Sequence, residues 1–297
     1  MQDRPLAAAV HVVAAMAIIG LIDQFVQVIA RDGSLWTFHL LRAAMMWGMA
    51  LVWIAATGAR PRVVSWPGVA GRSALMSVAM MVYFGALGFV PVAQAAAGLY
   101  AAPVFVAILS VVALRRRLDP ARIAAALVGF AGVVLVLAPD PARMGAATLV
   151  PIASGAFYAM AVLTTRAWCG REQPLVLALG VFACMAAWGA GGIAVDAVWG
   201  LGDGFLGRGW VAPTPEVWLW TSVQAVGSLV AVVLLSRGYL LAEASFVSVF
   251  EYSVLGFSAL FGLIVWGDRL GPAGLAGLAL IAGAGIVTAA RERRDRS

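Results

Sequence analysis

Three ionisable residues lie inside apolar stretches that are long enough to cross a lipid bilayer, and they are the first candidates for chemistry. Asp23 and Arg42 fall in the first two stretches, and Glu251 lies near the middle of the ninth. An unpaired charge in a bilayer costs at least ~2.5 kcal/mol. Each of these side chains is therefore expected to pair with another group, with a proton or with a bound solute.

Asp23 and Arg42 are placed at similar depth in neighbouring stretches, so they could pair across adjacent helices. Such a pair would either hold two helices together or take part in binding or gating, and the sequence leaves both interpretations open. His39 lies one helical turn before Arg42. We interpret it as a packed or interfacial residue rather than a proton carrier, and keep all three as ion-pair or gating candidates.

Glu251 has no basic residue at similar depth in its own stretch, which makes it the sharpest single candidate. Ser248 precedes it by about one turn, and Tyr252 follows it directly. The sequence predicts that Glu251 binds a proton or the substrate, because an unpartnered carboxylate is costly in the bilayer. A buried, hydrogen-bonded glutamic acid is the alternative. Glu243, at the start of the same stretch, is interpreted as a helix cap.

Tyrosine and glutamine side chains recur in the middle of several stretches, where each polar group needs a partner. We expect them to converge on a cavity, although packing between helices would satisfy each one separately. Pro103 removes a backbone hydrogen bond and predicts a kink that could serve as a hinge. Besides Glu251 and Ser248, the cavity candidates are Tyr83, Tyr100, Tyr158, Tyr252, Gln94 and Gln224.

Enzyme motifs are weak or absent in the sequence. The segment from Gly202 to Gly207 spells GxGxxG, but no strand precedes it and it reads as a loop. The two histidines cannot supply HExxH, and the absence of lysine excludes Schiff-base chemistry. Cys169 and Cys184 are interpreted as structural thiols. We therefore expect no cofactor, no metal site and no enzyme; a membrane-embedded enzyme or an assembly subunit is the weaker alternative.

The composition requires that these residues be held mainly by membrane helices. Of 297 residues, 63% are hydrophobic and 11% are charged, with a mean hydropathy of +0.96, which leaves too little polar surface for a soluble globule. The net charge of +6 does not indicate nucleic-acid binding, because the basic residues lie between the apolar stretches. The sequence predicts an all-α integral membrane protein without a soluble domain.

Ten apolar stretches of about 20 residues divide the chain. They are expected from Leu6 to Ile29, Leu35 to Thr57, Trp66 to Phe89, Pro91 to Leu114, Ala121 to Ala138, Gly145 to Trp168, Pro174 to Trp199, Pro215 to Ser236, Ala242 to Trp266 and Gly271 to Ala290.

The arginines predict that both termini are cytoplasmic, because positive loops are retained on that side. With this orientation, only Arg31, Arg143, Arg208 and Arg269 fall in outer loops, Arg42 lies within a helix, and the other fifteen of the 20 basic residues are cytoplasmic. Arg72 is counted in that cytoplasmic set.

An internal repeat becomes visible at a shift of 152 residues, which places Tyr100 on Tyr252 and Phe105 on Phe257. The predicted units are residues 1–141 and 142–297, each with five helices. Because five is odd, the second unit must insert upside down relative to the first, which is the inverted repeat of alternating-access transporters.

Small residues at a spacing of four predict close helix approach in the fifth and tenth stretches. The pairs are Ala125 with Gly129 and Ala279 with Gly283. These helices are expected either to brace the bundle or to meet a second protomer, so a homo-oligomer stays open.

The chain resembles the duplicated EamA-type exporters of the drug/metabolite transporter superfamily over essentially its full length, and among them the YddG-type aromatic amino acid exporters. The features that carry the resemblance are Leu41-Arg42-Ala43, the segment from Pro91 to Pro103, and Gly267-Asp268-Arg269-Leu270. The resemblance implies ten helices around a central cavity formed chiefly by the first, third, fourth, sixth, eighth and ninth.

The sequence departs from the pattern of this family at three places. Ile19-Gly20 stands where a Trp-Gly is usual, Arg115-Arg116-Arg117 replaces Gly-Glu-Arg, and Val254-Leu255 replaces the Glu-Pro of the ninth helix. A role that the family gives to that Glu-Pro would pass to Glu251 only if this residue, one turn earlier, substitutes for it.

The resulting expectation is a multi-pass protein of the bacterial inner membrane that exports small amphipathic metabolites by alternating access. Aromatic or bulky apolar amino acids are the expected substrates; a multidrug, cation or purine-type exporter is the alternative. The expected partners are the small-molecule substrate and membrane lipid, with no nucleic acid.

Overall fold

The computed structural model describes residues 4–86, 92–113, 115, 119–137, 149–200 and 202–294, and within these ranges its regular elements are all helices. Ten helical segments there are long and apolar enough to cross a membrane. The prediction of an all-helical, multi-pass membrane protein with ten spans is therefore confirmed, while the orientation of the termini stays a prediction.

The first five spans are α1 (Pro5–Ile22) with η1 (Asp23–Phe25) and α2 (Val26–Asp32), α3 (Leu35–Thr57), α4 (Trp66–Ala86), α5 (Val92–Leu99) with α6 (Ala102–Val112), and α7 (Pro120–Leu137). The second five are α8 (Leu149–Cys169), α9 (Pro174–Trp199), α10 (Pro215–Leu241), α11 (Ala244–Val247) with η4 (Ser248–Tyr252) and α12 (Ser253–Trp266), and α13 (Pro272–Arg294).

Local signals at the span ends explain where several helices begin and end. Ser34 precedes α3, and its hydroxyl accepts a hydrogen bond from the Thr37 amide at 3.1 Å, which satisfies one of the free donors of the first turn. Thr214 does the same for Val217 at the start of α10. Gly58 ends α3 with a φ of 65°, a left-handed conformation that glycine adopts without strain.

Three spans are interrupted in mid-course, and the sequence predicts only the interruption of the fourth. The first narrows to a 3₁₀ turn at Asp23–Phe25, and the ninth does so at Ser248–Tyr252. The fourth breaks at Tyr100 and Ala101, just before Pro103 in the first turn of α6. Proline has no N–H to donate to the residue four positions earlier, so the helix loses a bond where the sequence predicts the kink.

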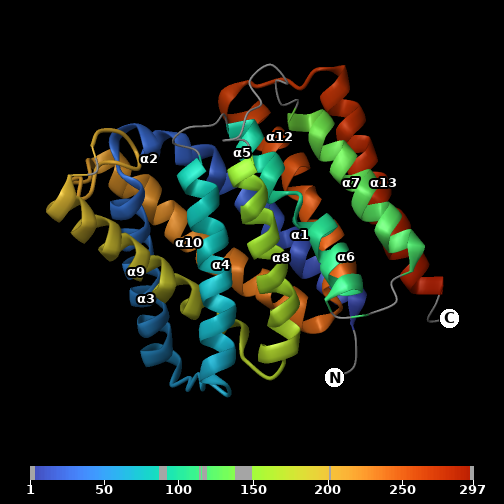
Figure 1. Ribbon diagram of the computed structural model, residues 1–297, viewed down its shortest axis with the longest axis horizontal. Coiled ribbons are helices and arrows are strands. Elements are labelled where there is room, and N and C mark those ends of the chain that lie inside the picture. Colours follow the sequence, from blue (N-terminus) through green and yellow to red (C-terminus); the bar gives the residue numbers. More distant parts are fainter. Residues whose placement is uncertain are drawn as a thin grey trace.

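The spans pack in pairs that join the two halves of the chain. α1 packs along α10, α4 along α8, α3 along α9, and α7 along α13 (Figure 1). α12 also packs on α1, and α5 and α6 pack on α8. Exchanging each span of the first half with its counterpart in the second maps these pairs onto one another, as a two-repeat architecture requires. The repeat and its boundary at residue 141 stay predictions.

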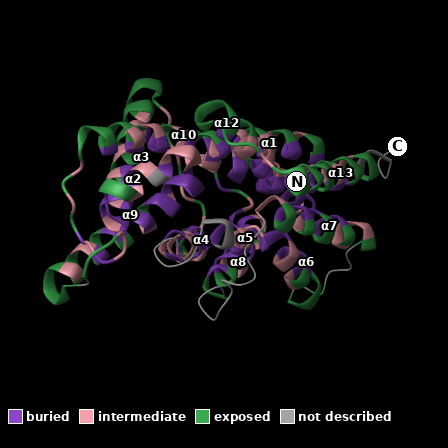
Figure 2. Cartoon of the chain, turned by 90° about the horizontal axis from the view of Figure 1, so that it is seen from above, coloured by how far each residue is buried: buried purple, intermediate pink, exposed green. Residues whose placement is uncertain are grey.

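Exposed residues lie on the outer faces of the bundle, and its buried residues face inward (Figure 2). Many of the exposed residues are large and apolar. Val52, Ile264 and Ile286 expose 69%, 68% and 69% of their surface. Large apolar residues exposed to this degree on many spans fit contact with lipid rather than with water. Both termini lie at the same end of the bundle, as an even number of crossings requires (Figure 1).

Glycines allow α7 and α13 to approach closely. A Cβ atom on Gly132 would lie 2.6 Å from the Gly277 carbonyl oxygen, and one on Gly277 would lie 2.6 Å from the Gly132 oxygen. Gly129 instead packs against the Tyr252 ring, and a Cβ atom on Gly283 would meet nothing within 4 Å. The close approach is therefore made by Gly132 and Gly277 rather than by the predicted Gly129 and Gly283, and contact of the open Gly283 face with a second protomer stays a prediction.

Replacing Gly132 with leucine is expected to lower the unfolding temperature of the protein. The new side chain would collide with the backbone of α13, and overpacking typically costs roughly 1–3 kcal/mol. Thermal unfolding of the purified protein in detergent measures the effect. Gly283→Leu is the matched control on the same helix pair, since open space surrounds it. Equal unfolding temperatures for the two variants would show that the seam is not tightly packed.

Candidate functional site

A cavity of ≈ 140 Å³ lies among the interrupted spans. Methionine, aliphatic and aromatic side chains form most of its wall, and the six spans implied by the family resemblance all contribute. α3 and α9 add Arg42 and Phe182, which the resemblance did not include. The polar residues of the lining are Asp23, Arg42, Arg72, Gln224, Ser228 and Glu251, together with Tyr83, Tyr100, Tyr158 and Tyr252.

Glu251 is held at one end of this cavity by two tyrosines. The Tyr158 hydroxyl of α8 donates to Oε1 of Glu251 at 3.0 Å, and the Tyr239 hydroxyl of α10 donates to the same oxygen. The Glu251 side chain is 5% exposed and lies in the 3₁₀ turn η4. Three spans therefore fix one carboxyl group, which lines the cavity wall.

Arg72 lines the same cavity, and sequence reasoning missed it. Its Nε donates to the Thr165 hydroxyl at 3.0 Å, and Nη1 donates to the Leu177 carbonyl at 3.2 Å, so one buried guanidinium joins α4, α8 and α9. It also interacts electrostatically with Tyr158 and Tyr239, the two donors to Glu251. Counting it among the loop arginines was wrong. Arg72 lies about two turns inside an apolar stretch, and this position could have identified it as a buried arginine.

Tyr239 was also missed, because it lies near the end of its span. Tyr239 and Tyr158 are the two tyrosines whose hydroxyls donate to Glu251 among the described residues. Tyr252 lines the cavity, but its hydroxyl donates to the Ala126 carbonyl of α7 at 3.1 Å. Tyr83 and Tyr100 line the cavity wall.

Asp23 and Arg42 both line the cavity but do not form an ion pair. No carboxylate oxygen of a residue in the described ranges lies within 4.0 Å of Arg42. Arg42 instead contacts Nδ1 of His39 through Nη2 at 3.1 Å, while Asp23 interacts with the Gln224 side chain. Asp23 and Arg42 therefore interact electrostatically but without the direct contact that the sequence left open, since equal depth does not decide which way two side chains turn.

Gln224 connects the first and eighth spans. Its Nε2 donates to the Ile22 carbonyl at 2.7 Å, directly before the 3₁₀ turn that carries Asp23. The Ser228 hydroxyl donates to Oε1 of Gln224 at 3.4 Å. This amide satisfies a backbone group where the helix is interrupted, and it also lines the cavity.

Two other candidates do not reach the site in the described part of the chain. Ser248 is 1% exposed but does not line the cavity, and its hydroxyl has no hydrogen-bond partner. Gln94 lies in α5, but its side chain is outside the described residues. Pro103 lines the cavity beside the break in the fourth span.

The acidic groups of the lining are held at different levels of α10. Asp23 interacts with Gln224, and Glu251 accepts a hydrogen bond from Tyr239, which lies fifteen residues farther along that helix. Among the residues that the structure describes, no group of three His, Cys, Asp or Glu side chains converges to hold a metal ion.

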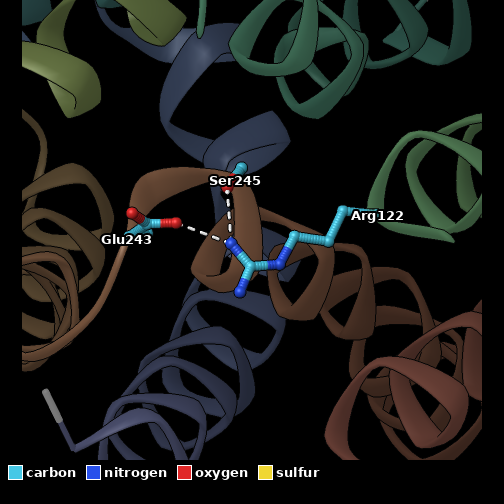
Figure 3. A network of polar contacts seen from close by, with 3 residues as sticks. All are labelled: Arg122, Glu243 and Ser245. Carbon is cyan, nitrogen blue, oxygen red and sulfur yellow. Dashed lines mark hydrogen bonds and ion pairs between the residues drawn. The ribbon is translucent and has the colours of Figure 1, made fainter. Parts of the chain in front are cut away.

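Glu243 lies outside the cavity, at the N-cap position of α11, but its side chain makes no capping hydrogen bond. It forms an ion pair with Arg122 of α7, whose Nη1 lies 2.6 Å from Oε2 of Glu243 and also donates to the Ser245 hydroxyl at 3.4 Å (Figure 3). The position expected for Glu243 is correct, and its charge connects two spans rather than capping one.

Known proteins resemble this chain in sequence and fold. Residues 6–138 match the EamA-like transporter family. A riboflavin transporter of Rhizobium johnstonii is 28% identical over 228 residues, which cover 76% of this chain and 71% of the relative. An uncharacterized transporter of Helicobacter pylori is 27% identical over 222 residues, 74% of this chain and 72% of the relative.

One solved crystal structure superimposes with a TM-score of 0.78 over 99% of this chain and 100% of the other, at 19% identity, which shows the fold alone. Together, the matches make this chain similar to EamA-like transporters over residues 6–138 and to curated transporters over about three quarters of its length. They do not single out the aromatic amino acid exporters, because the relatives with a named substrate are riboflavin transporters.

Proposed function

We propose that this protein is a secondary transporter that moves small amphipathic metabolites outward across the bacterial inner membrane by alternating access. The observation that carries the proposal is the cavity between the interrupted spans, with an apolar wall and ionisable side chains toward both ends. Such groups are expensive inside a bilayer and typically mark the path of a substrate or ion. The only partners that this proposal requires are the solute and the surrounding lipid.

The arrangement of the helices supports alternating access. Spans from both halves meet around the cavity, and their pairing is the one expected of two related units. In such transporters, interrupted helices near the midplane provide the binding site at the interface of the repeats. Tyr100 and Tyr252, which the predicted repeat aligns, each lie at an interruption and line the cavity.

Aromatic or bulky apolar amino acids are the substrates that we propose first. The cavity volume of ≈ 140 Å³ is similar to that of an apolar protein cavity of about 150 Å³ that binds benzene. One ring-sized side chain would therefore fit against the methionines and tyrosines. The ammonium and carboxylate groups are bonded to one carbon, so they would pair in the same region of the cavity, where Asp23 and Arg42 both line the wall.

Riboflavin-like heterocycles are the second candidate, because three relatives are named riboflavin transporters. A fused three-ring system is larger than a single ring, so it would need a wider cavity than this conformation has. Purines and organic cations of the same size class are further alternatives within this fold.

A substrate panel tests the proposal in proteoliposomes. Counterflow of phenylalanine, tryptophan, methionine, threonine, adenine, riboflavin and tetraphenylphosphonium would be compared with that in protein-free liposomes. We expect saturable exchange of phenylalanine or tryptophan at a rate at least ten times that of tetraphenylphosphonium. Transport of riboflavin alone would favour the second candidate. Transport of the cation alone, or of none of the solutes, would overturn the proposed function.

A further inference from the structure

We infer that Arg42, positioned by His39, binds the carboxylate of the transported solute. This inference rests on the proposed function and adds to it a chemical class: an acid whose body is aromatic or otherwise apolar.

Arg42 has more buried donors than partners. A guanidinium carries five N–H groups and accepts no hydrogen bond. The side chain is 5% exposed, its one hydrogen bond goes to His39, and its Nε has no partner. A buried donor without an acceptor costs about 1–3 kcal/mol, and more when it is charged. Asp23 interacts with this charge electrostatically, but no carboxylate oxygen of the described residues lies within 4.0 Å of it. The unsatisfied donors line the cavity, where a solute could supply the acceptor.

His39 presents a second orphaned donor in the same cluster. Because Arg42 can only donate, Nδ1 of His39 must accept the 3.1 Å hydrogen bond, which leaves the ring proton of the neutral imidazole on Nε2. That nitrogen is buried without a partner in a side chain that is 0% exposed. His39 does not line the cavity, so its role at this site is to hold the Arg42 guanidinium through Nδ1.

Three phenylalanine rings surround the guanidinium and limit how a ligand can reach it. The Cζ atom of Arg42 lies 4.7 Å from the ring centre of Phe38, 5.7 Å from that of Phe84 and 5.6 Å from that of Phe182. Cation–π contacts stabilise the charge but leave the N–H groups unsatisfied. A planar carboxylate can accept two parallel hydrogen bonds from this fork. Phe84 and Phe182 also line the cavity, so they can contact the apolar body of the same solute.

The test compares two probes that differ only in charge at one end, 3-phenylpropionate and 3-phenylpropionamide. Dissociation constants would be measured by equilibrium dialysis on the purified full-length protein in detergent, for wild type, Arg42→Gln, Arg42→Lys and Arg237→Gln. Arg237 is the matched control, because it is an exposed arginine on α10.

Wild type is expected to bind the acid at least tenfold more tightly than the amide, as charge-assisted hydrogen bonds allow. Arg42→Gln should reduce this preference to less than threefold, and Arg237→Gln should keep it. Arg42→Lys retains the charge but not the fork, so it should keep only part of the preference. Unfolding temperatures of the ligand-free variants verify that each is folded. The wild-type comparison decides the question even if Arg42→Gln fails to fold.

Equal binding of acid and amide by wild type, or an unchanged preference in Arg42→Gln, would overturn the inference. These outcomes are distinguishable from failure of the proposed function, which is measured by transport. If the solute panel is exchanged while the acid has no advantage, the transporter proposal stands and the carboxylate site is wrong. Riboflavin binding that Arg42→Gln abolishes, without any preference for the acid, would also overturn it in favour of a neutral acceptor.

Discussion

Glu251→Gln is expected to reduce the rate of substrate exchange in proteoliposomes at least tenfold. The substitution preserves the size of the side chain but removes its ability to become charged. Two tyrosine hydroxyls donate to one Glu251 oxygen, and hydrogen bonds to a charged group contribute about 1.5–3 kcal/mol each. Losing about 1.4 kcal/mol already corresponds to a factor of ten. Initial rates between pH 5 and pH 8 measure both the size and the pH dependence of the effect.

Glu216→Gln is the appropriate control for this prediction, because Glu216 is exposed in the first turn of α10. Glu243→Gln is a second comparison, and it is expected to change the rate less than Glu251→Gln although it disturbs the ion pair with Arg122. If wild type and Glu251→Gln have the same rate at every pH, Glu251 is a packing residue, and the cavity end that it marks has no role in transport.

Arg72→Met is expected to destabilise the protein by roughly 3 kcal/mol or more. Methionine fills much of the same volume, but the two hydrogen bonds to Thr165 and Leu177 are lost, and hydrogen bonds of charged groups contribute about 1.5–3 kcal/mol each. The guanidinium is 1% exposed, so water cannot replace them. Thermal unfolding in detergent should show a shift of several degrees.

The matched control is Arg31→Met, an exposed arginine in the last turn of α2. It is expected to unfold at the wild-type temperature. Replacing a buried charge with a well-packed apolar residue can also leave stability unchanged. If Arg72→Met unfolds at the same temperature as the control, Arg72 does not stabilise the fold. Its position in the cavity wall would then be the better reason for its presence.

The spans could be predicted from the sequence because a bilayer imposes a length on every crossing. The ten stretches found by hydropathy correspond to the ten spans of the structure. The interruptions could not be predicted equally well. Pro103 marks the break of the fourth span, whereas no proline or glycine marks the 3₁₀ turn at Ser248–Tyr252. That turn depends on the helices packed around it.

Most residues of the candidate site could be predicted from the sequence, but the hydrogen bonds between them could not. Glu251 and the tyrosines were expected at a cavity because polar groups are rare in lipid. The partners of Glu251 were not, since Tyr239 lies near a span end and no spacing in the sequence links it to a residue on another helix. The contacts of Arg42 could not be predicted either. Its depth follows from the sequence, but its turn toward His39 and the phenylalanine rings depends on the rotation of α3.

The break in the first span also opposes rotation of α1 about its own axis. The Gln224 amide of the neighbouring span donates to the Ile22 carbonyl, directly before the 3₁₀ turn. A rotation of α1 that carried Ile22 toward the acyl chains would break this hydrogen bond, and lipid offers no donor in exchange. The bond thus keeps the side chains beside the break directed at the centre of the bundle.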